Sequence, residues 1–249
     1  MVLQRYAALL LTVAALLSLP GCTSVGEAPP YSSPMASSLP DISGLAWIAG
    51  SRFLAIHDAK DQTNRPRVSI VDLPQSPTGL THPWPWPHGL SSDLESVARI
   101  PGTSLILLLE SGSGERRGAP LRRIFLVEHG DRGLEIVDVV DWPVSVNNVE
   151  GAAVARVGEQ LIFLFAERAE GQGSTALRWA PMTVRPVAFG SFQEVRFTAP
   201  NPTGRNARPV TAVESDDVGR IYVASAVDPG TDNGPFRSVI WRIGRIEAD

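Results

Sequence analysis

Asp93-Leu-Glu-Ser-Val-Ala-Arg-Ile100 is followed in the sequence by Ser104-Leu-Ile-Leu-Leu-Leu-Glu110 and then by Arg123-Ile-Phe-Leu-Val-Glu128. Each stretch is short, rich in aliphatic residues and bounded by Gly, Pro or polar residues, which is typical of β-strands. The run 105–109 is apolar at every position, as expected of a strand covered on both faces. We therefore predict that these three strands form one unit of antiparallel sheet.

Units with the same order of strands begin at Asp41, Asn148 and Val210. From Asp41 to Asp93 is 52 positions, and from Asp93 to Asn148 is 55. A period of about 50 residues built from short strands is typical of propeller blades. The sequence therefore predicts an all-β domain over residues 41–249, a β-propeller of four to five blades. A two-sheet β-sandwich is the alternative, since sandwiches also consist of short strands separated by turns.

The first 21 residues have the features of a lipoprotein signal peptide. Arg5 is followed by an apolar segment over 6–19, too short to span a bilayer comfortably, and the leader ends at Cys22. Cys22 is the single cysteine, so it cannot form a disulfide within the chain, and lipidation explains its presence. An ordinary secretory leader that is cut a few residues later is the alternative. Residues 22–40 are rich in Pro and Ser and predict a tether.

These features predict a lipid-anchored protein of the cell envelope, attached to a membrane without spanning it. Thr23 follows the cysteine, and by resemblance to lipoprotein sorting in enteric bacteria this favours the outer membrane, facing the periplasm. The formal net charge of −4 argues against nucleic acid as a partner, because phosphate binding needs clustered positive charge. Lys60 is the only lysine, so a phosphate-binding Gly-Lys-Ser/Thr loop is excluded.

Acidic residues recur where strand one of a unit begins and strand two ends. In an antiparallel blade these two positions lie at the same edge, so we expect the acids to meet at one mouth of the central channel. The predicted metal ligands are Asp58, Asp93, Glu95, Glu110, Glu150, Glu167, Glu214 and Asp228. Mutual repulsion favours a bound cation, and Ca²⁺ accepts six to eight oxygen ligands in irregular geometry. The alternative is that each acid caps backbone amides or locks a neighbouring blade by hydrogen bonds.

The segments 93–98 and 148–153, followed by acids at the ends of the next strands, resemble the phytase-like (esterase-like) β-propeller proteins of bacteria. This resemblance implies a propeller fold. It also implies calcium held at positions such as Glu95, Glu110, Glu150 and Glu167.

Two functions follow from these features. The first is a propeller that binds a small molecule or an envelope protein through a cation-binding acidic mouth. The second is a calcium-dependent phosphoesterase, in which Arg168 or Arg99 holds the phosphate while bound cations activate water. Because one fold hosts many functions, the fold alone does not decide between them.

Overall fold

The computed structural model describes residues 42–58, 66–72, 80–86, 91, 93–113, 115–116, 119–130, 133–169, 173–227 and 237–247. Their regular structure is β-strand throughout. No helix among them is long and apolar enough to cross a membrane. The predicted leader, Cys22 and the tether lie outside the described residues.

The strands form four sheets in chain order, which we call blades 1 to 4. Blade 1 contains β1 (Ile42–Ala49), β2 (Arg52–His57), β3 (Val68–Asp72) and β4 (Leu80–Trp84). Blade 2 contains β5 (Leu94–Arg99), β6 (Leu105–Glu110), β9 (Arg123–Gly130) and β10 (Gly133–Asp141). The short strands β7 (Glu115–Arg116) and β8 (Ala119–Pro120) form a separate hairpin between β6 and β9.

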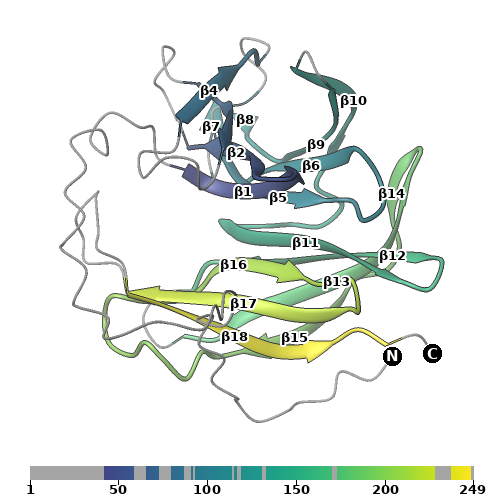
Figure 1. The fold of residues 1–249 in the computed structure, drawn as a ribbon. Helices are drawn as coiled ribbons and strands as arrows, with labels where there is room; N and C mark the ends of the chain where they lie inside the picture. The colour runs from purple at the N-terminus through teal and green to yellow at the C-terminus, as the bar shows by residue number, and fades with distance from the viewer. Residues whose placement is uncertain are drawn as a thin grey trace, which may run out of the picture.

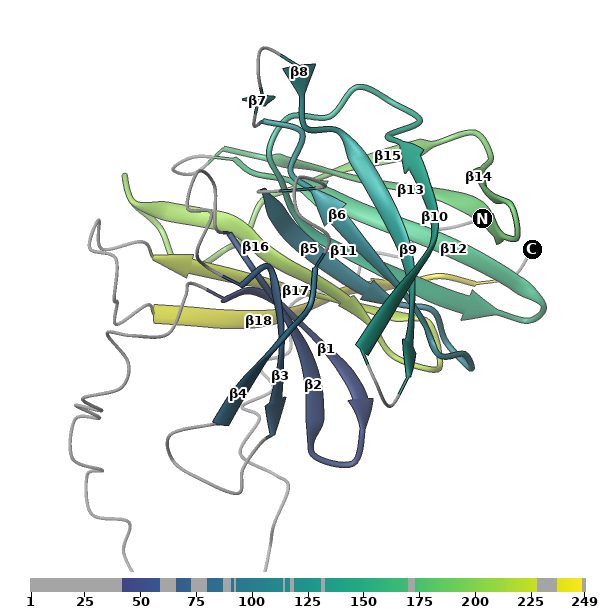
Figure 2. The ribbon, with the colours of Figure 1, turned by 90° about the horizontal axis from the view of Figure 1, so that it is seen from above.

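Blade 3 contains β11 (Val149–Val157), β12 (Gln160–Glu167), β13 (Thr175–Val184), β14 (Val187–Phe189) and β15 (Gln193–Phe197). Blade 4 contains β16 (Ala207–Ser215), β17 (Arg220–Val227) and β18 (Arg237–Arg245). The innermost strands β1, β5, β11 and β16 lie at the centre of the molecule (Figures 1 and 2). The predicted β-propeller is confirmed, with four blades in the described part of the chain, and the sandwich alternative is not adopted.

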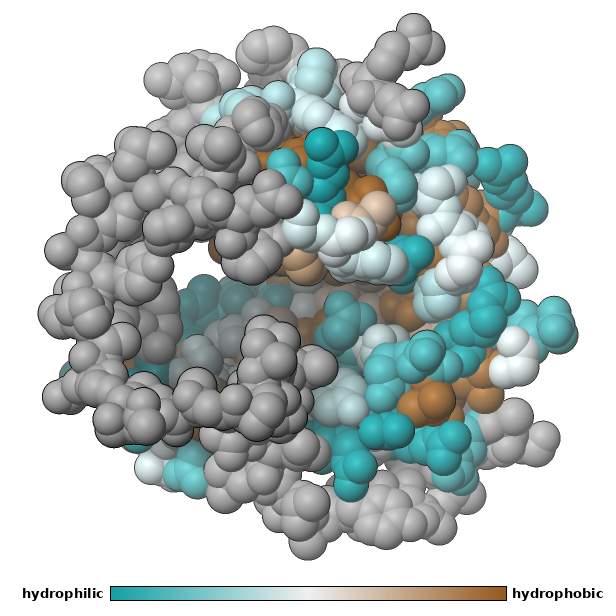
Figure 3. Space-filling view, in the orientation of Figure 1, coloured by the Kyte–Doolittle hydropathy of each residue, from teal (hydrophilic) through white to brown (hydrophobic). Residues whose placement is uncertain are grey.

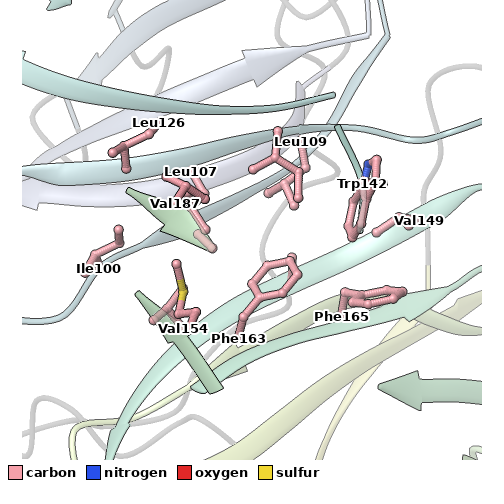
Figure 4. Close-up of a cluster of buried hydrophobic side chains, with 14 of the residues drawn as sticks. Ile100, Leu107, Leu109, Leu126, Trp142, Val149, Val154, Phe163, Phe165 and Val187 are labelled. Carbon is pink, nitrogen blue, oxygen red and sulfur yellow. The ribbon is translucent and has the colours of Figure 1, made fainter. Parts of the chain in front are cut away.

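Three hydrophobic clusters hold consecutive blades together. Leu54 of blade 1 packs with Leu108 of blade 2, and Leu164 of blade 3 packs with Val223 of blade 4. The cluster between blades 2 and 3 is the richest in aromatic rings, with Phe163 and Phe165 facing leucines of β6 (Figure 4). Burying one such side chain contributes about 1.5–3 kcal/mol, so these interfaces fix the order of the blades.

The contact between blades 4 and 1 is looser than the other three. Leu45 and Trp47 of β1 are 43% and 45% exposed. Ile240 of β18 in blade 4 is 53% exposed. Among the described residues, β1 and β16 do not make the extensive contact that joins the other neighbouring inner strands.

The inner strands of blades 1 to 3 share an irregularity one residue after they begin. In blade 1, Ile42 pairs with His57 and Gly44 with Ile56, so Ser43 is an extra, bulged residue. The same register shift makes Glu95 the bulged residue of β5 and Glu150 that of β11. A bulge re-aims the side chain of its extra residue. The repeat therefore presents one side chain per blade at the same end of the channel.

Candidate functional site

The inner strands of blades 1 to 3 begin at one end of the channel, and we call this end the bulge mouth. Hydrophilic side chains cover much of the described surface that faces the viewer in Figure 3, with hydrophobic residues between and behind them. Six of the eight predicted acidic residues fall into two groups when equivalent positions of the blades are compared. One group stands at the bulge and beside it, and the other stands on strand two, opposite the first residue of strand one.

Asp58, Asp93 and Glu95 form a carboxylate cluster where blades 1 and 2 meet. Asp58 follows β2 and pairs with Asp93 in an isolated antiparallel bridge, while Glu95 is the bulged residue of β5. One oxygen of each carboxylate lies within 4.8 Å of the corresponding oxygen of the other two. Asp93 is buried, and Asp58 and Glu95 are partly exposed. The cluster is thus open on the solvent side.

The size of this triangle can be compared with the coordination distances of metal ions. Three oxygens separated by no more than 4.8 Å all lie within about 2.8 Å of a common centre. Calcium–oxygen distances are about 2.3–2.6 Å, whereas Mg²⁺ requires about 2.0–2.1 Å in a strict octahedron. Small side-chain adjustments would therefore let the three residues share a calcium ion. Zinc fits less well because the cluster offers neither histidine nor thiolate.

A chain of hydroxyl groups continues from the cluster toward blade 3. The hydroxyl of Ser111 donates to Oδ2 of Asp93, which fixes the orientation of that carboxylate. Ser111 Oγ also lies 2.7 Å from Ser113 Oγ, and Ser113 donates to Oδ1 of Asn148 at 3.3 Å. Ser111 occupies in blade 2 the position that Asp58 occupies in blade 1. Asn148 occupies in blade 3 the position that Asp93 occupies in blade 2. The bulge mouth therefore carries a polar arc over three blades.

The blade 3 end of this arc is an ion pair rather than a carboxylate cluster. Nη1 of Arg168 lies 3.5 Å from Oε1 of Glu150, the bulged residue of β11. Arg168 occupies the position that corresponds to Asp58 in blade 1. Because a cation replaces an acid there, the predicted ring of negative charge is interrupted at blade 3.

Glu110 belongs to the second group and ties strand two of blade 2 to strand three. It is fully buried, and its carboxylate accepts two hydrogen bonds from the Arg123 guanidinium, at 2.7 and 3.1 Å, and one from the Arg123 backbone N–H at 2.8 Å. Burial raises the pKa of Glu110, opposed by its hydrogen bond with Ser91 and by the charge of Arg123. These contacts favour a structural role.

His57 and Glu167 stand at the corresponding positions of blades 1 and 3 and make similar ties. His57 is fully buried and its Nε2 bonds to Ser69 on β3. Oε1 of Glu167 accepts from Arg178 on β13 at 3.3 Å and from the Asn147 backbone N–H at 3.0 Å. The bond that Glu167 accepts from the Asn147 backbone N–H fits the alternative interpretation of the acids, in which they cap backbone amides.

The raised pKa of Glu110 gives a testable pH dependence. A carboxyl group whose pKa is higher in the folded state contributes stability that is complete below the unfolded pKa and is lost as pH rises through the folded pKa. The free energy of unfolding of the protein, minus that of Glu110→Gln, should therefore fall as pH rises from about 4.5. Urea denaturation at a series of pH values measures this difference. A difference that grows with pH would mean that Arg123 outweighs burial.

The remaining predicted residues lie elsewhere. The sequence pattern places Glu214 where strand one of blade 4 begins, but β16 starts earlier, and Glu214 pairs with Tyr222 near the far end of the strand. The register predicted for blade 4 is therefore wrong. Arg99 is the last residue of β5, and its guanidinium lies 4.6 Å from the Trp47 ring centroid. Asp228 lies outside the described residues.

Sequence reasoning does not single out Ser111, Ser113, Arg123 or Arg178 for these roles. The Gly-Ser composition around Ser111 and Ser113 is typical of a flexible connection, and no spacing pattern marks the two hydroxyls. The arginines could have been found by asking which cation on strand three faces the acid that ends strand two, because Arg123 and Arg178 both lie on β-strands that pair with strand two.

Comparison with known proteins does not identify the chain further. No protein-family model matches it, and no curated protein matches it either. Among solved structures, the crystal structure of an α-L-arabinofuranosidase from Lactobacillus brevis is similar over 86% of this chain and 72% of its own, with 13% sequence identity and a TM-score of 0.47. Similarity at this level supports no inference about activity.

Proposed function

We propose that the protein is a binding propeller that holds a calcium ion at Asp58, Asp93 and Glu95 and presents it, at the bulge mouth, to an anionic group of a small molecule or an envelope protein. The observation that carries this proposal is the close approach of three carboxylate oxygens within 4.8 Å. Like charges at this separation repel, and a divalent cation would relieve that repulsion. The remaining coordination positions would be filled by water and by the ligand.

The phosphoesterase alternative, suggested by the resemblance to the phytase-like family, needs cations near the metal to hold a phosphate. Arg99 lies at the other end of β5, about 20 Å along the strand from Asp93, and stacks on Trp47. Arg168 is at the bulge mouth, but Glu150 already neutralises its charge. This arrangement favours binding over hydrolysis.

Hydrolysis of para-nitrophenyl phosphate distinguishes the two functions. We expect no calcium-dependent turnover, because neither Arg99 nor Arg168 is placed to hold a phosphate beside the carboxylate cluster. Asp93→Asn is the matched control, since it keeps the shape of the side chain and removes its charge. Calcium-dependent turnover that disappears in Asp93→Asn would show that the protein is an enzyme.

We also propose that lipid on Cys22 anchors the propeller to the outer membrane, on its periplasmic side, by way of the tether 22–40. Cys22→Ala should then move the protein from the membrane fraction to the soluble fraction of the envelope, because a lipid chain is required for stable attachment. Fractionation followed by immunoblotting measures the distribution. A Cys22→Ala protein that stays with the membrane would refute the anchor.

A further inference from the structure

The outer strands β10 and β18 carry opposite charges. β10 is the edge strand of blade 2, is nine residues long and contains Glu135, Asp138 and Asp141. β18 is the described edge strand of blade 4, is also nine residues long and contains Arg237, Arg242 and Arg245. An edge strand offers a row of backbone N–H and C=O groups that can pair with another strand. The two edges are therefore complementary in length and charge.

Both edges also expose aliphatic side chains. Val137 and Val139 of β10 are 38% and 41% exposed, and Ile240 of β18 is 53% exposed. These three are among the few large hydrophobic residues that lie exposed in the described part of the chain. An exposed apolar side chain between charges is the pattern of an interaction surface with a polar rim.

The charges at the two edges are available to a partner, because Glu135, Asp141, Arg237 and Arg242 are all exposed. β10 and β18 also lie on opposite outer sides of the propeller, as both ribbon views show (Figures 1 and 2). β10 and β18 of one molecule therefore cannot pair with each other.

We propose that β10 of one copy of this chain docks on β18 of a second copy, so that the propellers associate head to tail. Charged edges usually prevent aggregation because identical edges repel. Here the repulsion between like charges opposes pairing of β10 with a second β10 and of β18 with a second β18, whereas β10 and β18 attract each other. The contact joins two different surfaces, so it generates a ring if the rotation closes and a filament if it does not. This inference does not depend on the calcium site.

Two charge-reversed variants test the proposal. In the first, Glu135→Lys and Asp141→Lys make the β10 edge basic; in the second, Arg237→Glu and Arg242→Glu make the β18 edge acidic. Sedimentation equilibrium at concentrations up to about 1 mM reports the association constant of each protein. We expect the unaltered protein to self-associate at about 20 mM salt and to dissociate at about 500 mM, because screening weakens exposed ion pairs.

Each variant alone should associate at least tenfold more weakly, and an equimolar mixture of the two should recover association, because each variant keeps one unaltered edge and the two altered edges carry opposite charges. Recovery on mixing also shows that both variants are folded. Glu159→Lys adds positive charge in the exposed turn between β11 and β12 of blade 3, outside both edge strands, and should leave association unchanged. An unaltered protein that stays monomeric at about 1 mM, or a mixture that does not recover, would overturn the proposal.

Discussion

Replacing Gly151 by alanine is expected to lower the free energy of unfolding by about 3 kcal/mol, which corresponds to a fall in Tm of about 6–12 °C. A Cβ atom at this position would clash with the Val213 backbone nitrogen and would lie 2.7 Å from the Ala212 carbonyl carbon. Both contacts are with backbone, so no side-chain rotation relieves them. Strands β11 and β16 would have to separate, and the interface between blades 3 and 4 would lose packing.

Two other glycines provide controls for this result. At Gly44, the corresponding residue of blade 1, a Cβ would lie 2.9 Å from Cγ1 of Val97, a side chain that can move, so Gly44→Ala should cost less. At Gly130 an added Cβ would meet no atom within 4 Å, so alanine should change the free energy of unfolding by no more than about 0.5 kcal/mol. Urea denaturation of the three variants gives the ranking. Equal costs at all three positions would contradict the close approach of β11 and β16.

The strand pattern of this fold could be predicted from the sequence because it depends on local hydrophobicity. The structure confirms three of the predicted strands: the run 105–109, the strand that ends at Glu167 and the outer strand at 133–140. Blade 4 was less predictable, since the apolar pattern gave no sign that β16 begins as early as Ala207. That shift alone moves Glu214 from the first residues of the inner strand to its far end.

The candidate site could be predicted only in part. The repeat indicated which ends of the strands meet, and Asp58, Asp93 and Glu95 do lie together as that geometry requires. It could not indicate that Glu110 accepts from Arg123, because that contact depends on which residue of strand three lies beside the end of strand two. The bulge that makes Glu95 an extra residue of β5 leaves no mark in the sequence.

Calcium is expected to stabilise the protein strongly through Asp58, Asp93 and Glu95. A ligand present at 100 times its Kd stabilises the folded state by about 2.7 kcal/mol, which corresponds to a rise in Tm of about 5–11 °C. In Glu95→Gln this rise should be largely lost. The calcium-induced rise, and not the stability without calcium, is therefore the quantity that distinguishes this variant from the unaltered protein.

Glu167→Gln is the matched control for this second prediction. Its carboxylate is held by Arg178 and by the Asn147 backbone N–H, so we expect the variant to lose stability with or without calcium and to keep the full calcium-induced rise. If Glu167→Gln abolished the calcium effect and Glu95→Gln did not, the assignment of the two groups of acids would be reversed. Scanning calorimetry in calcium and in a chelator measures both quantities.

Isothermal titration with calcium is the most direct measurement of the cation site, with the Asp58→Asn, Glu95→Gln double variant titrated beside the unaltered protein. The carboxylate cluster predicts one bound ion for the unaltered protein and no detectable binding for the double variant, whose fold is checked by its unchanged circular dichroism. An unaltered protein that binds no calcium at millimolar concentrations, or a double variant that binds it equally well, would contradict a calcium site at the bulge mouth.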